Sequence, residues 1–208
     1  MQGTNKEGKD PLGGKTAVVK KKDIKIRETD TSSALKDVVV EDKYRPEVSG
    51  VYNDPDGYKV ATSLHSLVAI KEPIDEKEAG KIINPKTKEE IKGNFPNWKA
   101  FLPKEKGETK MKLSELNSLS KQAVELQKTN ITSVAKIGGI DKNFNPKILN
   151  NTIESMRKLG VEDVTVLGND NRNGALILQG TNKEGKDVFG MVMPMMVKDE
   201  DQYMTITQ

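Results

Sequence analysis

The sequence has no cysteine, a single histidine and few aromatic side chains. Without cysteine, the chain forms no disulfide bond, offers no thiolate ligand to a metal and has no cysteine nucleophile. Aromatic residues make up 4% of the 208 residues, which predicts a modest hydrophobic core beneath a well-solvated surface. No apolar run is long enough to span a bilayer, so we expect a cytoplasmic protein of a bacterial host, without a membrane partner.

An excess of charge of one sign is also lacking. Lysine and arginine total 34 against 31 aspartate and glutamate residues, which leaves a net charge of +3. A charge this small does not require a nucleic-acid partner, although a basic face on part of the molecule is compatible with it.

Three short motifs are typical of catalysis or ligand binding, and each is incomplete. Residues 13–16 (Gly-Gly-Lys-Thr) end like a phosphate-binding loop, but Lys9 stands where the first glycine belongs. Residues 169–174 begin like a calcium-binding loop, but Gly180 replaces the bidentate glutamate, and a hairpin turn explains them better. His65 has no neighbouring motif that would make it a catalytic base. We therefore expect no enzymatic activity, no catalytic residue, no metal and no cofactor.

Hydrophobic periodicity predicts an α+β fold. The expected helices are residues 29–42, 111–128 and 145–160, and the expected strands are 23–28, a meander within 46–70, 131–139, 161–168, 174–180 and 186–197. A helix followed by an antiparallel three-strand meander thus occurs twice, with the helices expected on one face of the sheets. We divide the chain into an N-terminal arm or hairpin (1–22), a first domain (23–104), a second domain (105–197) and an acidic, partly mobile tail (198–208).

Several stretches resemble the bacterial DNA polymerase III beta sliding clamp and its phage relatives. RPEVSGVY (45–52) and ATSLHSL (61–67) are similar to a clamp strand and the clamp motif ATDGHRL, with serine, leucine and serine in place of Asp, Gly and Arg. FPNW (95–98), followed by FLP, is similar to the YPNY…IP connector between clamp domains. FNPKIL (144–149) and Met193-Pro194-Met195 resemble the family's FN-x-x-YL helix start and C-terminal MPM.

The resemblance implies a non-catalytic processivity factor, a homo-oligomeric ring that encircles duplex DNA and tethers a polymerase or other replication proteins. Helices would line the ring and attract phosphates without reading the bases. The candidate DNA-facing residues are Lys121, Lys128, Lys147, Arg157 and Lys158. An ordinary solvated helix surface explains each of these cations equally well.

The resemblance also implies a hydrophobic pocket for short partner peptides, formed in part by Met191, Val192, Met193, Pro194 and Met195. Methionine is flexible and polarizable, which suits a surface that accepts several partners. A methionine-rich core strand is an equally good interpretation of the same run.

A second hypothesis is a phage structural or assembly protein with an α+β fold and no clamp role. It is motivated by the arm-like N-terminus, the modest net charge and Ser66, which stands where clamps carry an arginine.

The string QGTNKEGKD occurs at both residues 2–10 and 179–187. The second copy lies between two apolar stretches, which predicts a hairpin turn with Gly185 at positive φ. The first copy keeps the turn sequence without the flanking strands. We interpret it as a duplicated piece of the last hairpin. If it still forms a hairpin, it extends a sheet edge at a subunit junction; the alternative is a disordered remnant.

Overall fold

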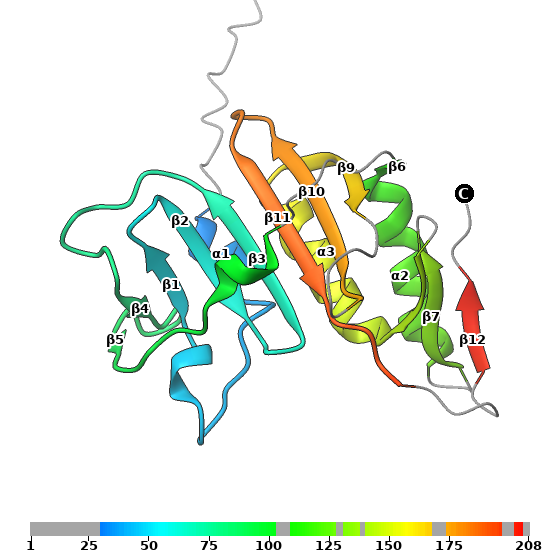
Figure 1. Ribbon diagram of the computed structural model, residues 1–208, viewed down its shortest axis with the longest axis horizontal. Coiled ribbons are helices and arrows are strands. Elements are labelled where there is room, and N and C mark those ends of the chain that lie inside the picture. The colour runs from blue at the N-terminus through cyan, green and yellow to red at the C-terminus, as the bar shows by residue number, and fades with distance from the viewer. Residues whose placement is uncertain are drawn as a thin grey trace, which may run out of the picture.

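The structure is a computed structural model that describes residues 30–102, 109–127, 131–137, 140–167, 174–196 and 202–205. The described strands form two sheets (Figure 1). The larger sheet contains, in spatial order, β5 (Glu90–Ile91), β4 (Ile82–Ile83), β1 (Val51–Asp54), β2 (Tyr58–Thr62), β3 (Ser66–Lys71), β11 (Asp187–Val192), β10 (Leu176–Asn182), β9 (Val161–Leu167) and β6 (Thr109–Lys112). The smaller sheet contains β12 (Gln202–Thr205), β7 (Ile131–Ile137) and β8 (Ile140–Phe144).

The predicted repetition of a helix and a three-strand meander is confirmed. The first unit is α1 (Thr31–Leu35) with β1, β2 and β3, and the second is α3 (Pro146–Lys158) with β9, β10 and β11. The last strands of the two units pair antiparallel, from Ile70 opposite Val188 to Ser66 opposite Val192. A single sheet therefore runs through both units.

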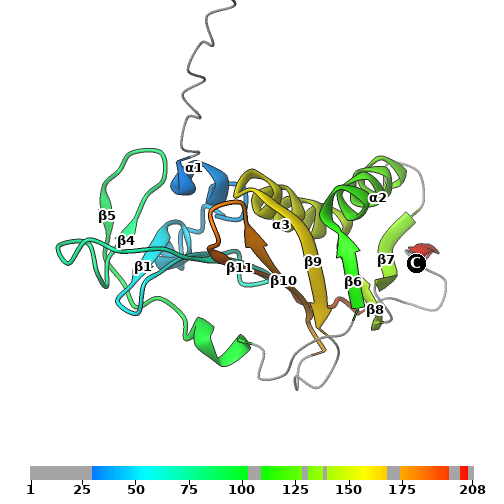
Figure 2. The ribbon, with the colours of Figure 1, turned by 90° about the horizontal axis from the view of Figure 1, so that it is seen from above.

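The helices lie on one face of the large sheet, as expected for the α+β fold (Figure 2). The third helix, α2 (Leu113–Leu126), packs beside α3. The core beneath the helices combines Leu35 and Val68 of the first unit with Ile153 and Leu178 of the second. This shared core holds the two units together, in addition to their common sheet.

Part of the opposite face of the large sheet is covered by residues 95–102, which follow β5. This segment contains the 3₁₀ helix η2 (Trp98–Phe101), which lies on the side of the sheet away from the helices (Figure 2). Trp98 is buried there with Val60, Ala69 and Met191, which belong to three different strands. The sequence predicted an extended connector, and the structure shows a segment docked on the sheet through its aromatic side chains.

Local sequence determines the ends of α3. The Asn145 side chain accepts hydrogen bonds from the backbone N–H groups of Lys147 (3.0 Å) and Ile148 (3.2 Å), and Pro146 occupies the first turn. Gly160 follows the helix with φ +89°, a conformation that favours glycine. Both ends of this helix agree with the sequence prediction.

Other expected boundaries were wrong. Helix α1 ends at Leu35 rather than near residue 42, because three consecutive valines at 38–40 disfavour the helical conformation. The helix expected from residue 111 begins at Leu113, because the preceding residues form β6. The last meander strand ends at Val192, five residues before its expected end.

Several strand pairings were not predicted. Strand β8 pairs with β7, and the short strands β4 and β5 extend the large sheet next to β1. The C-terminal tail contributes β12, which pairs parallel with β7. The strand expected at 23–28 and the first copy of the repeated string lie outside the described residues.

Candidate partner-binding corner and helix face

The pairing of β3 with β11 brings together two motifs that lie far apart in the sequence. Met191 pairs with Leu67 and Val192 with Ser66. The ladder continues beyond β11, because the Met193 N–H donates to the carbonyl of His65 at 2.8 Å. The turn between β2 and β3 therefore lies beside the methionine-rich segment that leaves β11, where Figure 1 shows both at one end of the paired strands.

The β2–β3 turn holds a leucine in an unusual backbone conformation. Leu64 has φ +69° and its side chain is partly exposed to solvent. Hydroxyl groups maintain the turn: Thr62 Oγ1 accepts from the Leu64 N–H (3.1 Å) and Ser63 Oγ accepts from the Ser66 N–H (3.1 Å). The turn thus keeps a glycine-like conformation at the position where the similar clamp motif has glycine, and it presents an apolar side chain there.

The methionine-rich segment has a buried part and a surface part. Met191 and Val192 are buried on opposite faces of the sheet, with Met191 in the cluster around Trp98. Met193, Pro194 and Met195 are half-buried, and Met196 is 97% exposed. The five predicted pocket residues therefore divide into two core positions and three surface positions.

The surface part also joins the two sheets. The Met195 N–H donates to the carbonyl of Asn143 on β8 at 2.8 Å, whereas Met193 is bonded to the β2–β3 turn. We call Leu64, His65 and Met193–Met196 the apolar corner. His65 is exposed in this turn, one residue before β3 begins, which is its expected place.

At the other end of β2, beside Tyr58, a buried carboxylate anchors the segment that covers the sheet. Asp54 Oδ2 accepts from the Trp98 indole N–H at 2.8 Å, and Asp54 Oδ1 lies 2.9 Å from Lys99 Nζ. Burial alone would raise the pKa of Asp54, but hydrogen bonds from Lys99, the Asp56 N–H and Trp98 hold that pKa below its ordinary value. Stacking of Tyr52 on Phe95, with ring centroids 4.8 Å apart, adds a second anchor.

A signal for this anchor is present in the sequence. Trp98 is the only tryptophan, and a buried indole N–H needs an acceptor. The acceptor, Asp54, is part of the turn that links β1 to β2, so its role could be found only once the chain was folded.

Four of the five predicted DNA-facing cations lie on the outward side of α2 and α3, and three of these four are paired. Lys121 Nζ is 2.5 Å from Glu154 Oε1, and Arg157 Nη2 is 3.0 Å from Glu154 Oε2. Lys158 forms an ion pair with Asp37, which follows α1. The structure thus brings Lys121 and Arg157 together from two helices.

Two predicted cations are in a different situation. Lys147, in the first turn of α3, is exposed and makes no ion pair with another described residue. Lys128 lies outside the described residues.

The charged residues of α2 and α3 are four cations (Lys121, Lys147, Arg157 and Lys158) and three carboxylates (Glu115, Glu125 and Glu154), and α1 has none. The helix face is close to electrical neutrality.

Comparison with solved structures finds the same fold in bacterial proteins. The chain matches the Helicobacter pylori beta clamp, solved with 3,4-difluorobenzamide, at a TM-score of 0.56 and 11% identity over 81% of the chain. It matches the Bartonella birtlesii sliding clamp, DNA polymerase III subunit beta, solved with griselimycin, at 0.60 and 12% over 81%. It matches the Thermotoga maritima DNA polymerase III beta subunit at 0.59 and 14% over 82%. The fold is that of a beta sliding clamp.

The resemblance inferred from short motifs is confirmed at the level of the fold. The match covers 64%, 65% and 63% of the three clamp chains, respectively, so the chain spans somewhat less than two-thirds of their length. No protein-family model matches the sequence, and no curated protein matches it. The arrangement of helices and strands therefore shows the clamp fold, and in the sequence the short motifs indicate it.

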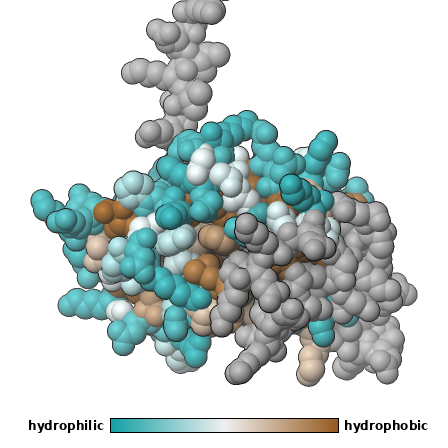
Figure 3. Space-filling model, turned by 45° about the horizontal axis from the view of Figure 1, so that its top comes forward, coloured by the Kyte–Doolittle hydropathy of each residue, from teal (hydrophilic) through white to brown (hydrophobic). Residues whose placement is uncertain are grey.

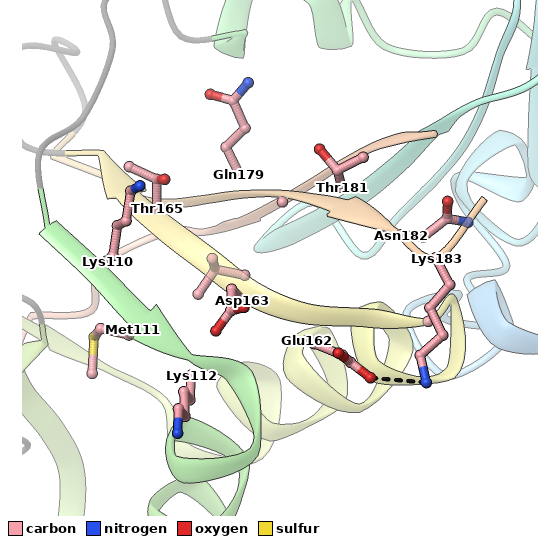
Figure 4. A pocket seen from close by; sticks show the side chains of 13 residues that line it. Lys110, Met111, Lys112, Glu162, Asp163, Thr165, Gln179, Thr181, Asn182 and Lys183 are labelled. Carbon is pink, nitrogen blue, oxygen red and sulfur yellow. Dashed lines mark ion pairs between the residues drawn. The ribbon is translucent and has the colours of Figure 1, made fainter. Parts of the chain in front are cut away.

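A hollow on this clamp-like fold lies away from both surfaces. It has a volume of about 850 Å³, is open to solvent and lies over β6, β9 and β10 (Figure 4). Its lining includes Lys110, Lys112 and the ion pair of Glu162 with Lys183 (2.8 Å). It also includes residues 179–183 of the second copy of the repeated string. Among the described residues, no cluster of histidine and carboxylate side chains fits a metal ion.

The described part of the face drawn in Figure 3 has the hydrophilic character that the composition predicted. Figure 3 shows mostly hydrophilic side chains, with hydrophobic areas of small extent between them. Within the part of the chain that the structure describes, no helix is long and apolar enough to cross a membrane. Five large hydrophobic side chains are exposed among the described residues (Val40, Tyr44, Leu64, Leu126 and Met196), and two of them, Leu64 and Met196, belong to the apolar corner.

Proposed function

We propose that the protein is a non-catalytic, clamp-like processivity factor that encircles duplex DNA and tethers a polymerase or another replication protein. The observation that carries the proposal is the apolar corner, formed by two distant motifs on a fold shared with beta sliding clamps. A strained, exposed leucine next to a run of methionines is a feature that partner binding explains and core packing does not.

The helix face is the proposed DNA side, with Lys121, Lys128, Lys147, Arg157 and Lys158 near the phosphates. Because this face is nearly neutral, phosphate attraction there is weak. Weak, sequence-independent contacts suit a protein that slides and that is retained because it encloses the duplex.

Ring closure is part of the proposal and requires more than one copy. The chain spans 64% of the length of the Helicobacter pylori clamp that it matches. We retain the division into clamp-like units at 23–104 and 105–197 and propose that copies of this pair of units form a homo-oligomer. The sheet that runs through both units supports a stiff building block.

The experiment loads the protein on linear duplex DNA of a few kilobases through its free ends. Biotin on both ends is then blocked with streptavidin, and the DNA is washed at about 0.5 M salt, which removes proteins held by phosphate contacts. We expect the protein to stay on end-blocked DNA and to leave after one internal cut by a restriction enzyme. Equal loss from blocked and open DNA, or a monomeric mass by light scattering, would refute encirclement.

The second candidate, a phage structural or assembly protein without a clamp role, is favoured by the near-neutral helix face. A protein that only reuses the fold does not need cations on its helices. Its presence in purified virus particles, combined with no retention on end-blocked DNA, would select this alternative.

A further inference from the structure

Glu154 lies between two of the cations that the proposed function places near DNA. Its side chain is 14% exposed, and each carboxylate oxygen has its own partner. Oε1 is 2.5 Å from Lys121 Nζ on the neighbouring helix. Oε2 accepts from Arg157 Nε and lies close to Nη2, at 3.0 Å in both cases. The two cations are therefore directed at a carboxylate of the same protein.

Release of these cations toward a phosphate has an energetic cost. A carboxylate that is mostly buried is costly to leave without a partner. The hydrogen bonds from Lys121 and Arg157 lower the pKa of Glu154 although burial acts in the opposite direction, so its negative charge persists at neutral pH. That charge also repels a phosphate brought close to the same surface. Lys147 has no such restraint among the described residues.

We infer that Glu154 is a positioning residue that binds Lys121 and Arg157 in competition with the DNA phosphates and thereby limits the affinity of the helix face. The inference rests on the proposed DNA contact and adds a control of its strength. A face with weakened phosphate contacts lets an enclosed duplex move, so Glu154 favours mobility over tight binding. Among the charged residues of α2 and α3, only Glu154 joins the two helices in this way in the ion pairs of the described chain.

The test compares Glu154→Gln with Glu115→Gln. Both variants remove one negative charge from the helix face, but Glu115 is exposed on α2 and forms no ion pair with a described residue. Binding to a fluorescent duplex of about 30 base pairs is measured by anisotropy at a series of salt concentrations. We expect Glu154→Gln to bind at least about tenfold more tightly than Glu115→Gln at low salt, because it frees two cations. The slope of log K against log salt should steepen by about 0.9 for each phosphate gained.

A second comparison keeps Glu154 in place, so its result does not depend on whether the Glu154→Gln protein folds. In the otherwise unchanged protein, Lys121→Gln should weaken DNA binding less than Lys147→Gln does, because Glu154 already pairs with Lys121. In the Glu154→Gln background, Lys121→Gln should remove much of the gain, which a double-mutant cycle measures.

The outcomes separate this inference from the proposed function. Binding by the unchanged protein, with equal gains in the Glu154→Gln and Glu115→Gln variants, overturns the role of Glu154 and leaves the DNA contact standing. A loss in Lys121→Gln as large as that in Lys147→Gln also overturns it. The absence of binding by both the unchanged protein and Glu154→Gln overturns the inference together with the proposed DNA contact.

Discussion

At the scale of single residues, the contact between Asp54 and Trp98 shows how one buried charge positions a whole segment. The Asp54 side chain is 4% exposed and satisfies the indole N–H, the Lys99 ammonium group and the Asp56 N–H. Charge-assisted hydrogen bonds of this kind are stronger than neutral ones, and a donor left unpaired in a buried place is costly. One carboxylate thus anchors both Trp98 and Lys99 of the segment that covers part of the second face of the sheet.

We expect Asp54→Asn to lower the free energy of unfolding by about 1–3 kcal/mol at neutral pH. The folded-state pKa of Asp54 lies below the ordinary value, so its contribution is fully present above the unfolded-state pKa and is lost as the pH falls through the folded-state pKa. The difference between the variant and the unchanged protein should therefore be largest near neutral pH and shrink below about pH 4.

Urea unfolding, followed by the fluorescence of Trp98, measures this difference in the free energy of unfolding near neutral pH and below about pH 4. Asp56→Asn is the matched control, because Asp56 contacts the same lysine but its side chain is 71% exposed. We expect it to change the free energy of unfolding by less than about 0.5 kcal/mol. Equal effects of the two substitutions would show that burial of Asp54 is unimportant.

At the scale of secondary-structure elements, α3 is the element whose sequence most fully specifies its ends. Asn145→Ala removes an acceptor for two backbone N–H groups and should destabilise the protein by about 0.5–2 kcal/mol. Asn151→Ala, in the middle of the same helix, is the control and should be neutral or slightly stabilising, because alanine has the higher helix propensity. Thermal unfolding by circular dichroism compares the two, and a larger loss in Asn151→Ala would contradict the capping role.

Elements with a clear period and clear ends were the ones that the sequence predicted. The helix starting after Asn145 and the turns at Gly57 and Gly185, with φ +82° and +79°, carry their own chemistry. Strands β8 and β12 lack a strong hydrophobic period, and they form because each pairs with one edge of β7. The join of β3 to β11 is likewise set by tertiary pairing, which no local pattern encodes.

The same limit applies to the candidate sites. The sequence located the cations and the methionines, because composition and helical spacing show them directly. It did not show that Glu154 forms ion pairs with two of those cations, or that Leu64 adopts a left-handed conformation beside Met193. Both facts arise from side chains that meet only when the helices and strands are packed.

At the scale of the whole molecule, the helix face and the apolar corner are separate surfaces that can be altered independently. The corner lies where the two units share their sheet, whereas the cations lie on α2 and α3. Leu64→Asn is a suitable change there, because asparagine tolerates positive φ better than leucine and removes the apolar side chain. Met196→Asn removes the most exposed methionine of the corner without disturbing the core.

We expect the double variant Leu64→Asn/Met196→Asn to keep its fold, its oligomeric mass and its retention on end-blocked DNA. Its stimulation of primer extension by a replicative DNA polymerase from the same source should fall at least about tenfold, because the apolar anchor for the partner is lost. Product lengths on a long single-stranded template measure this loss, and the Glu115→Gln protein provides a surface-altered control. Full stimulation by the double variant would show that the polymerase is held elsewhere, whereas joint loss of stimulation and DNA retention would show that the corner belongs to the ring closure.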